Sequence, residues 1–234
     1  MPTPIHLRPA TGIAERVLLP GDPHRALAVA QAILEWPRMF NHARGLWGYT
    51  GTAADGAQLT VQSTGMGGPS AAIVVEELID LGARTLIRIG TCGALGPGFE
   101  PGELVVARKV LCADGASAAL GASQRIASDP GLTGLLATAG ARQVTAVSTD
   151  LFYDRRDGIE QEWREAGAEV VEMEAAALLA VAARRDVRAA VLLAVTDQLE
   201  GARRRRIEGG ELERVGVRLG ETAFAGLSAS GVRP

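Results

Sequence analysis

The run AAVLLAV, residues 189–195, is apolar at every position and leads directly into Thr196 and Asp197. Such a strand has no face for water, so it belongs in the middle of a sheet that helices cover on both sides. A three-layer α/β/α arrangement provides these two covers. We therefore predict an α/β fold with a central sheet between two layers of helices.

Short apolar or β-branched runs alternate with longer helical patterns over the rest of the chain. We predict strands over residues 16–21, 58–65, 85–91, 103–111, 143–149, 169–174 and 189–197. We predict helices over residues 24–34, 69–82, 132–140, 160–167, 173–185 and 211–227. Because no repeat or linker-like block divides the chain, we expect one domain over residues 1–234, with a surface loop or flap at 112–131.

Composition narrows the class of function. The 234 residues carry a net charge of −3, so no basic field attracts nucleic acid or an anionic membrane. No apolar run reaches the roughly 18 residues that a membrane span requires, and the N-terminus lacks a secretory pattern. Cys92 and Cys112 have no metal-ligand spacing to each other or to the histidines. We expect a cytoplasmic protein that acts on a small molecule and holds no metal.

Two strand exits carry residues suited to an anion. The segment PGDPHR ends a strand and begins a helix; there Gly21 lets backbone amides approach an anion, and Arg25 adds a charged donor. The same residues also make an ordinary turn. In RIGTCGAL, Arg88 lies inside a strand, where its charge requires either an ion pair or a bound anion. Thr91 can add a hydroxyl and an amide to that anion.

Carboxyl groups mark two further strand exits. Glu172 and Glu174 interrupt the otherwise apolar VVEMEAAALL, and Asp197 follows the buried run. A carboxyl in a partly apolar pocket can hold a proton and donate it to a leaving group, although Asp197 also suits a helix N-cap. STGMGGPS lacks the full GxGxxG spacing, so we expect no dinucleotide there. Met66 in that segment is predicted to form a soft apolar wall beside a ligand.

Several segments together resemble one family. PGDPHRA, NHARGLWGYTG, STGMGGPSAAIVVEEL, RIGTCGAL, STDLFY, VEMEAAAL and AVTDQ occur in this order, and they are similar to the hexameric purine nucleoside phosphorylases and uridine phosphorylases. The likeness runs over nearly the whole chain and weakens at residues 112–130 and after Gln198. It implies a mixed, partly barrel-like sheet. It also implies a phosphorolysis, in which inorganic phosphate attacks the anomeric carbon of a nucleoside and releases the base and ribose 1-phosphate.

The resemblance implies a phosphate site built from two subunits. The residues transferred to this site are Gly21, Arg25, Arg88 and Thr91, with Arg44 reaching across from the adjoining subunit. Three guanidinium groups around a dianion hold the nucleophile in line and neutralise it. Phosphate is then a co-substrate, and the reaction needs neither a cofactor nor a metal.

The ribose site transfers to the EME segment. Glu174 would accept hydrogen bonds from the 2′- and 3′-hydroxyls, and Met173 would pack on the sugar face. Met66 and Glu172 join the expected ribose-binding set, and His6 of the adjoining subunit would reach the 5′-hydroxyl. One alternative stays open, because Glu172 could instead balance the phosphate arginines.

The base site separates purine from pyrimidine enzymes. Phe152 would pack on the base, and Thr196-Asp197 resembles the Ser-Asp pair whose Asp protonates the purine N7. The Gln-x-Arg pair of uridine phosphorylases is missing after Phe152-Tyr153, although STGMGGPS and DGAS are closer to that branch. We therefore predict a purine nucleoside phosphorylase, with a uridine phosphorylase as the alternative.

Two other hypotheses stay open at this point. A hydrolytic nucleosidase of the methylthioadenosine type also uses a strand-end Asp, but it lacks the phosphate arginines. A nucleoside-binding protein without activity could have kept the same fold. The resemblance further implies a hexamer, built as a trimer of dimers, and an arginine that assists Asp197. Candidates for that arginine are Arg203 to Arg206 and Arg214.

Overall fold

The buried run at 189–195 forms the middle of β10 (Arg188–Glu200), and its residues are buried as predicted. This strand pairs in parallel with β5 (Thr85–Ala94) and antiparallel with β6 (Leu104–Ala113). The structure, a computed structural model, describes residues 4–200, 203–207 and 209–229, without the side chains of 199, 200 and 203–205.

Part of the sheet closes on itself. Strand β6 continues in parallel to β8 (Arg142–Thr149), and β8 pairs in parallel with β9 (Val170–Glu172). Strand β9 then pairs antiparallel with β5, which completes the ring β10-β6-β8-β9-β5. The prediction of a mixed, partly barrel-like sheet is therefore confirmed.

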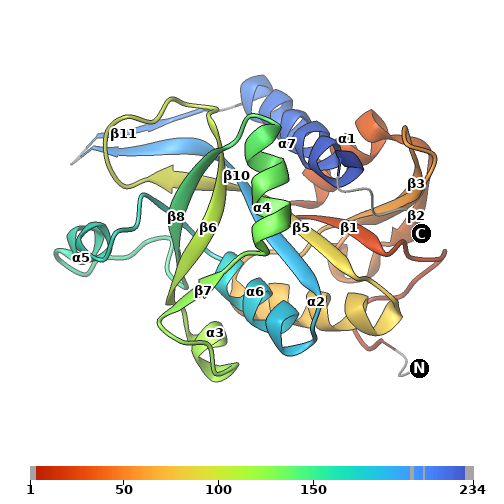
Figure 1. The fold of residues 1–234 in the computed structure, drawn as a ribbon, viewed down its shortest axis with the longest axis horizontal. Coiled ribbons are helices and arrows are strands. Elements are labelled where there is room, and N and C mark those ends of the chain that lie inside the picture. Colours follow the sequence, from red (N-terminus) through yellow and green to blue (C-terminus); the bar gives the residue numbers. More distant parts are fainter. Residues whose placement is uncertain (1–3, 201–202, 208, 230–234) are drawn as a thin grey trace.

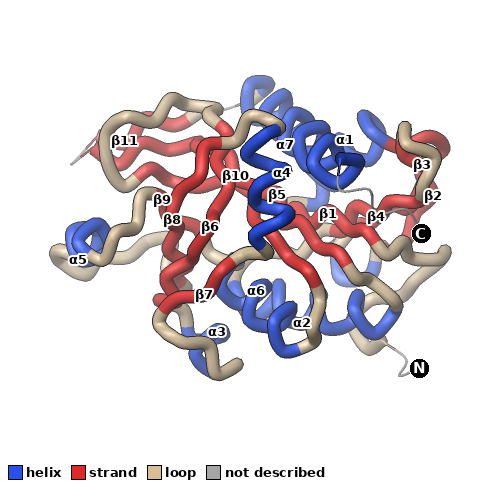
Figure 2. The backbone as a smooth tube through the Cα atoms, viewed as in Figure 1, coloured by secondary structure: helices blue, strands red, loops and turns tan. Residues whose placement is uncertain are grey.

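The remaining strands extend this ring (Figure 1, Figure 2). Beyond β5 the order is β1, β4, β3 and β2, while β7 lies beside β6 and β11 beside β10. Their bounds are Arg16–Pro20 for β1, Leu34–Asn41 for β2, Gly48–Ala53 for β3, Gln58–Gln62 for β4, Arg125–Ala127 for β7 and Arg203–Arg206 for β11.

Helices cover both faces of the sheet (Figure 1). Helices α1 (Pro23–Ile33), α4 (Pro130–Thr138) and α7 (Gly210–Ala229) share one apolar cluster with the sheet. Helices α2 (Gly68–Leu81) and α6 (Ala175–Arg184) form the other cluster, and the short α3 (Gly115–Ala119) packs beside them. Helix α5 (Ile159–Glu165) buries Trp163 against Leu95 and Val147. The predicted three-layer α/β/α architecture is confirmed.

All predicted strands and helices are present, but their boundaries differ, and the structure contains short elements that were not predicted. The predicted strand 169–174 ends at Glu172, and the helix predicted from Met173 begins at Ala175. The segment 112–131, predicted as a loop, contains the end of β6, helix α3 and strand β7. Neither α3 nor β7 is long enough to show a hydrophobic period in the sequence.

The hairpin of β2 and β3 was not predicted either, for a local reason. Trp36 has a φ of 49°, and the register slips between Glu35 and Arg38. Pro37 lies inside the slip, and β2 forms the edge of the sheet, which is where a proline is tolerated. The irregular strand therefore carries no alternating pattern.

Helices α1 and α7 pack closely through glycine. On α7, Gly216 and Gly220 lie four residues apart and face Arg25 and Val29 on α1. A Cβ atom at Gly220 would lie 2.4 Å from Val29 Cγ1, and one at Gly216 would lie 3.2 Å from Arg25 Cγ. The contact therefore has no room for a side chain at Gly220, whereas one at Gly216 would require Arg25 to move by a few tenths of an ångström.

We expect Gly220→Ala to lower the free energy of unfolding by about 1–3 kcal/mol, because the added methyl overpacks this contact. Thermal and urea denaturation at one protein concentration measure the change. Gly134→Ala is the matched control: Gly134 is exposed on the surface of α4 with open space around it, so alanine should raise stability by about 0.5–1 kcal/mol. Equal effects at both positions would contradict the packing explanation.

Candidate active site

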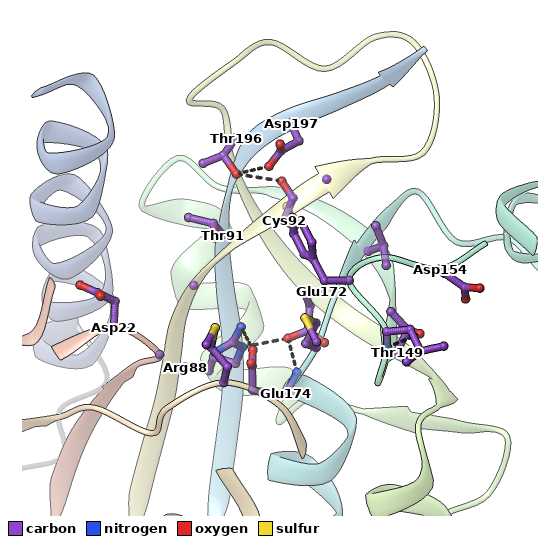
Figure 3. Close-up of a pocket in the computed structure, with 18 of the residues that line it drawn as sticks. Asp22, Arg88, Thr91, Cys92, Thr149, Asp154, Glu172, Glu174, Thr196 and Asp197 are labelled. Carbon is purple, nitrogen blue, oxygen red and sulfur yellow. Dashed lines mark hydrogen bonds and ion pairs between the residues drawn. The ribbon is translucent and has the colours of Figure 1, made fainter. Parts of the chain in front are cut away.

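A pocket of about 450 Å³ lies at the carboxyl ends of β1, β5, β8 and β9 and beside the distal part of β10. Ligands of α/β sheets collect at such strand ends. The pocket brings together the following predicted site residues: Gly21, Arg25, Met66, Arg88, Thr91, Phe152, Glu172, Met173, Glu174, Thr196 and Asp197. Figure 3 shows Thr196 and Asp197 apart from a second group formed by Arg88, Glu172 and Glu174.

Arg88 on β5 is buried and ion-paired on two sides. Its Nε donates to Glu172 Oε2 at 2.9 Å, and its Nη2 pairs with Glu174 Oε2. Burial alone would lower the pKa of Arg88, but Glu174 and Glu172 outweigh it and hold that pKa above its ordinary value. The third nitrogen, Nη1, is buried and has no hydrogen-bond partner among the described residues.

Two glycines make the space around this guanidinium. A Cβ at Gly90 would lie 2.7 Å from Arg88 Nη2, so only glycine fits there without displacing the side chain. A Cβ at Gly21 would lie 4.0 Å from Arg88 Nη1 and 3.2 Å from the Gly65 carbonyl oxygen. Arg88 Nη1 and the loop after β1 therefore border the same space.

Arg25 adds a second guanidinium to this end of the pocket. Asp22 caps helix α1 by accepting from the Arg25 amide at 2.7 Å, which fixes the first helical turn. Burial lowers the pKa of Arg25, the charge of Arg88 adds to this shift, and Asp22 and Glu174 oppose it. A bound anion would relieve the repulsion between the two arginines.

Glu174 links three segments of the chain. Its Oε1 accepts from the Gly67 amide at 2.6 Å, and its Oε2 pairs with Arg88. Gly65 and Gly67 have φ values of 74° and 85°, which glycine adopts readily. The GxGG segment thus supplies a backbone amide that binds a carboxylate of the same chain. Burial raises the pKa of Glu174, and the charge of Glu172 adds to the shift, while Arg88 and the Gly67 amide oppose it.

The other end of the pocket holds Thr196 and Asp197. The register of β10 against β5 slips between Val195 and Asp197, so Thr196 is the extra residue of a β-bulge. Thr196 Oγ1 lies 2.9 Å from Asp197 Oδ2, and Asp197 Oδ1 is buried without a hydrogen bond from the described part of the chain. Arg206 Nε approaches Oδ1 to 3.7 Å from the neighbouring strand β11.

Apolar side chains border the space between the two ends. Phe152 is 42% exposed and meets Tyr153 edge-on, with ring centroids 5.0 Å apart. Met66 is 86% exposed at the pocket rim, whereas Trp163 is buried. The chain alone therefore leaves this side of the pocket open to solvent.

The match to a family model covers almost the whole described chain. The model of the phosphorylase superfamily matches residues 15–228, which include every pocket residue. The chain belongs to the phosphorylase superfamily. The family predicted from the ordered motifs is thus confirmed, and so is the α/β fold that it implies.

Three members of the superfamily with similar sequences are named purine nucleoside phosphorylase DeoD-type. The protein from Geobacillus kaustophilus (strain HTA426) is 39% identical over 208 residues, which cover 83% of this chain and 86% of the relative. That from Alkaliphilus metalliredigens (strain QYMF) is 39% identical over 83% of this chain and 88% of the relative. The protein from Roseobacter denitrificans (strain ATCC 33942 / OCh 114) is 36% identical over 80% of this chain and 84% of the relative.

Two predicted site residues lie outside the pocket of this superfamily member. His6 Nδ1 lies 2.7 Å from Glu77 Oε1 beside α2, and Arg44 is exposed in a left-handed conformation with a φ of 60°. Both were predicted to act on a neighbouring subunit, and a single chain does not test that. They stay predictions.

The structure adds residues that the sequence did not single out. Ser148 donates to Glu172, and Gly67 donates to Glu174, although neither carries a charge that would mark it. Of the candidate assisting arginines, Arg206 lies beside Asp197, and Arg214 is exposed on α7 outside the pocket lining. The side chains of 203–205 lie outside the described residues.

Neither a metal site nor a membrane span is found in the described ranges. No three His, Cys, Asp or Glu side chains there are grouped to hold a metal ion. None of the helices described is both long and apolar enough to cross a bilayer.

We expect Glu174→Gln to change how stability depends on pH. Because the folded-state pKa of Glu174 lies above its ordinary 4.5, the folded protein holds this proton more tightly than the unfolded chain. That stabilisation is complete below the unfolded pKa and is lost as the pH rises through the folded pKa. The variant should therefore lose less free energy of unfolding than the wild type as the pH rises above about 4.5, measured by urea denaturation.

Glu77→Gln provides a control of opposite sign. Burial would raise the pKa of Glu77, but the Leu7 amide and the donors of His6 lower it below 4.5. The stability that Glu77 contributes is therefore present above pH 4.5 and is lost as the pH falls. If both variants shifted the pH dependence in one direction, the assignment to Glu174 would be wrong.

Proposed function

We propose that this protein is a phosphate-dependent purine nucleoside phosphorylase. The observation that carries the proposal is Arg88 Nη1, a buried donor without a hydrogen-bond partner among the described residues, in the same pocket as the strand-end acid Asp197. A buried guanidinium donor is costly unless an anion accepts from it. The similarity to purine nucleoside phosphorylases supports the purine assignment over the uridine alternative.

Phosphate would bind between the loop after β1 and the end of β5. Arg88 Nη1 and Arg25 would donate to its oxygens, and Gly21 and Thr91 would add close backbone and hydroxyl contacts. Two positive charges beside a dianion neutralise the nucleophile and hold it in line with the anomeric carbon. A hydrolytic nucleosidase has no use for this pair, so the arginines favour phosphorolysis.

The nucleoside would lie across the pocket with its base toward Asp197. As phosphate attacks the anomeric carbon and the glycosidic bond breaks, the bonding electrons pass into the purine. A proton from Asp197 to N7 neutralises the leaving base. Arg206, 3.7 Å from Oδ1, would then stabilise the carboxylate that remains. Glu174 would accept from the ribose hydroxyls, and Phe152 and Met66 would cover the base and the sugar.

A neighbouring subunit would complete the pocket. Arg44 is exposed, and the pocket is open beside Phe152, which leaves room for groups from outside the chain. We propose that Arg44 joins the phosphate site and His6 the 5′-hydroxyl of an adjoining subunit in a hexamer. Light scattering coupled to size-exclusion chromatography tests this arrangement, and a fully active monomer would remove both residues from the site.

A nucleoside panel with and without inorganic phosphate tests the proposed function. Inosine, adenosine, guanosine and uridine are supplied in turn, and free base and ribose 1-phosphate are measured. We expect base release from purine nucleosides only when phosphate is present. Cleavage of uridine alone would overturn the role of Asp197, undiminished turnover without phosphate would indicate a nucleosidase, and no turnover at all would favour a binding protein.

Asp197→Asn should lower kcat for purine phosphorolysis by about 100-fold or more, because the amide cannot donate the proton. Steady-state kinetics with the best purine nucleoside measure this loss. Asp186→Asn is the matched control, since Asp186 is exposed and has a φ of 51°, a conformation that asparagine tolerates. Equal activity of the two variants would remove the acid from the mechanism.

A further inference from the structure

The carboxylate of Glu172 is fully enclosed by donors of its own chain. Its side chain is 0% exposed, and it accepts from Arg88 Nε, Ser148 Oγ and the amides of Glu174 and Ala175. The hydrogen bonds from Arg88 and from the two backbone amides measure between 2.9 and 3.0 Å. A carboxylate offers about four lone-pair positions, so these four donors leave none for a substrate hydroxyl.

Ser148 binds the Glu172 carboxylate on the side away from the pocket lining. It is fully buried on β8, outside the pocket lining, and donates through Oγ to Glu172 Oε1. Its Oγ also accepts from the Ala176 amide at 2.9 Å, in the first turn of α6. Ser148 and Glu172 together therefore join the ends of β8 and β9 to the start of α6.

We propose that Ser148 and Glu172 form a positioning pair that orients Arg88 for phosphate, and that Glu172 does not touch ribose. The inference rests on the proposed function, because it names what holds the phosphate-binding arginine in place. Glu172 fixes the guanidinium through Nε, and Glu174 fixes it through Nη2. The remaining nitrogen, Nη1, has no hydrogen-bond partner among the described residues and is held toward the space beside Gly21. Neither member of the pair needs to contact the substrate.

The same pair also shapes the ribose end through the backbone. Glu172 accepts from the amide of Glu174 at 2.9 Å, and this fixes the residue whose carboxylate is expected to meet the sugar. The contact is made by the backbone of Glu174, which a change in Ser148 leaves intact. Loss of Ser148 should therefore affect phosphate binding more than it affects the choice between sugars.

Ser148→Ala tests the pair without altering any group that can reach the substrate. We expect the KM for phosphate to rise about tenfold, in line with the loss of a hydrogen bond to a charged group. The KM for the nucleoside should change much less, and Ser148→Thr, which keeps the hydroxyl, should recover part of the loss. Ser128→Ala is the matched control, because Ser128 is a buried serine that donates to the Ala107 carbonyl at 2.6 Å outside the pocket.

Glu172→Gln separates the two roles of the glutamate. For each variant, kcat/KM is measured for the best purine nucleoside and for its 2′-deoxy counterpart. The proposal predicts that the ratio of the two values stays at the wild-type level while the phosphate KM rises. If Glu172 bound ribose, the preference for the ribonucleoside over its 2′-deoxy counterpart would fall sharply in Glu172→Gln. This result would overturn the proposal.

The outcomes distinguish this inference from the proposed function. A wild-type protein without phosphate-dependent turnover would overturn both. A wild-type phosphorylase whose Ser148→Ala variant keeps its phosphate KM would overturn the positioning pair alone. Circular dichroism and melting temperatures of Ser148→Ala and Ser128→Ala show whether a change in KM goes beyond a general loss of stability, and Ser148→Ala carries the test even where Glu172→Gln fails to fold.

Discussion

The pocket depends on a buried ion triplet in which Arg88 lies between Glu172 and Glu174. One positive charge faces two carboxylates in the interior, and burial together with the charge of Glu172 raises the pKa of Glu174. Removing the arginine would leave two buried carboxylates without compensation, which destabilises proteins by about 3–5 kcal/mol in comparable pairs. The triplet joins β5, the end of β9, the start of α6 and the glycine loop before α2. The end of the pocket that we propose for phosphate is therefore also a structural junction, where binding and stability would depend on the same residues.

The sheet sets the separation between the two ends of the pocket. Strands β5 and β10 run in parallel from Thr85 opposite Arg188 to Ala94 opposite Gln198. Each strand carries residues of one end of the pocket. Arg88 lies well inside β5, whereas Asp197 follows the bulge near the far end of β10. A nucleoside that spans them would meet Arg88, the proposed anion-binding group, and Asp197, the proposed acid. Both groups are held by the sheet, and a rigid frame keeps the reacting atoms in the geometry that the reaction requires. Met66 and Phe152 are exposed at the rim of the pocket.

Much of this organisation could be predicted from local sequence. The buried strand at 189–195 and the alternation of strands and helices predicted the three layers correctly. The spacing of apolar residues along a strand or helix shows which of its faces are buried. The ordered motifs gave the family, and they pointed to most of the residues that line the pocket. The hairpin of β2 and β3 was missed because a bulge at Trp36 and an edge proline erase the alternation. Ser148 was missed because a neutral serine at a strand end has no distinguishing mark until its partner is known.

The sequence by itself determined that the strand at 189–195 is buried on both faces, that Arg88 lies inside a strand, and that Glu172 and Glu174 lie near the end of another. These properties follow from the chemistry of consecutive residues. Only the tertiary structure decided which charged groups pair with one another. Arg88, Ser148 and Glu172 come from separate strands and meet through pairing across the sheet. It placed Arg206 beside Asp197, and it surrounded Glu172 with donors while leaving Arg88 Nη1 free among the described residues. Hydrogen-bond saturation depends on every neighbour in space, and no sequence pattern records it.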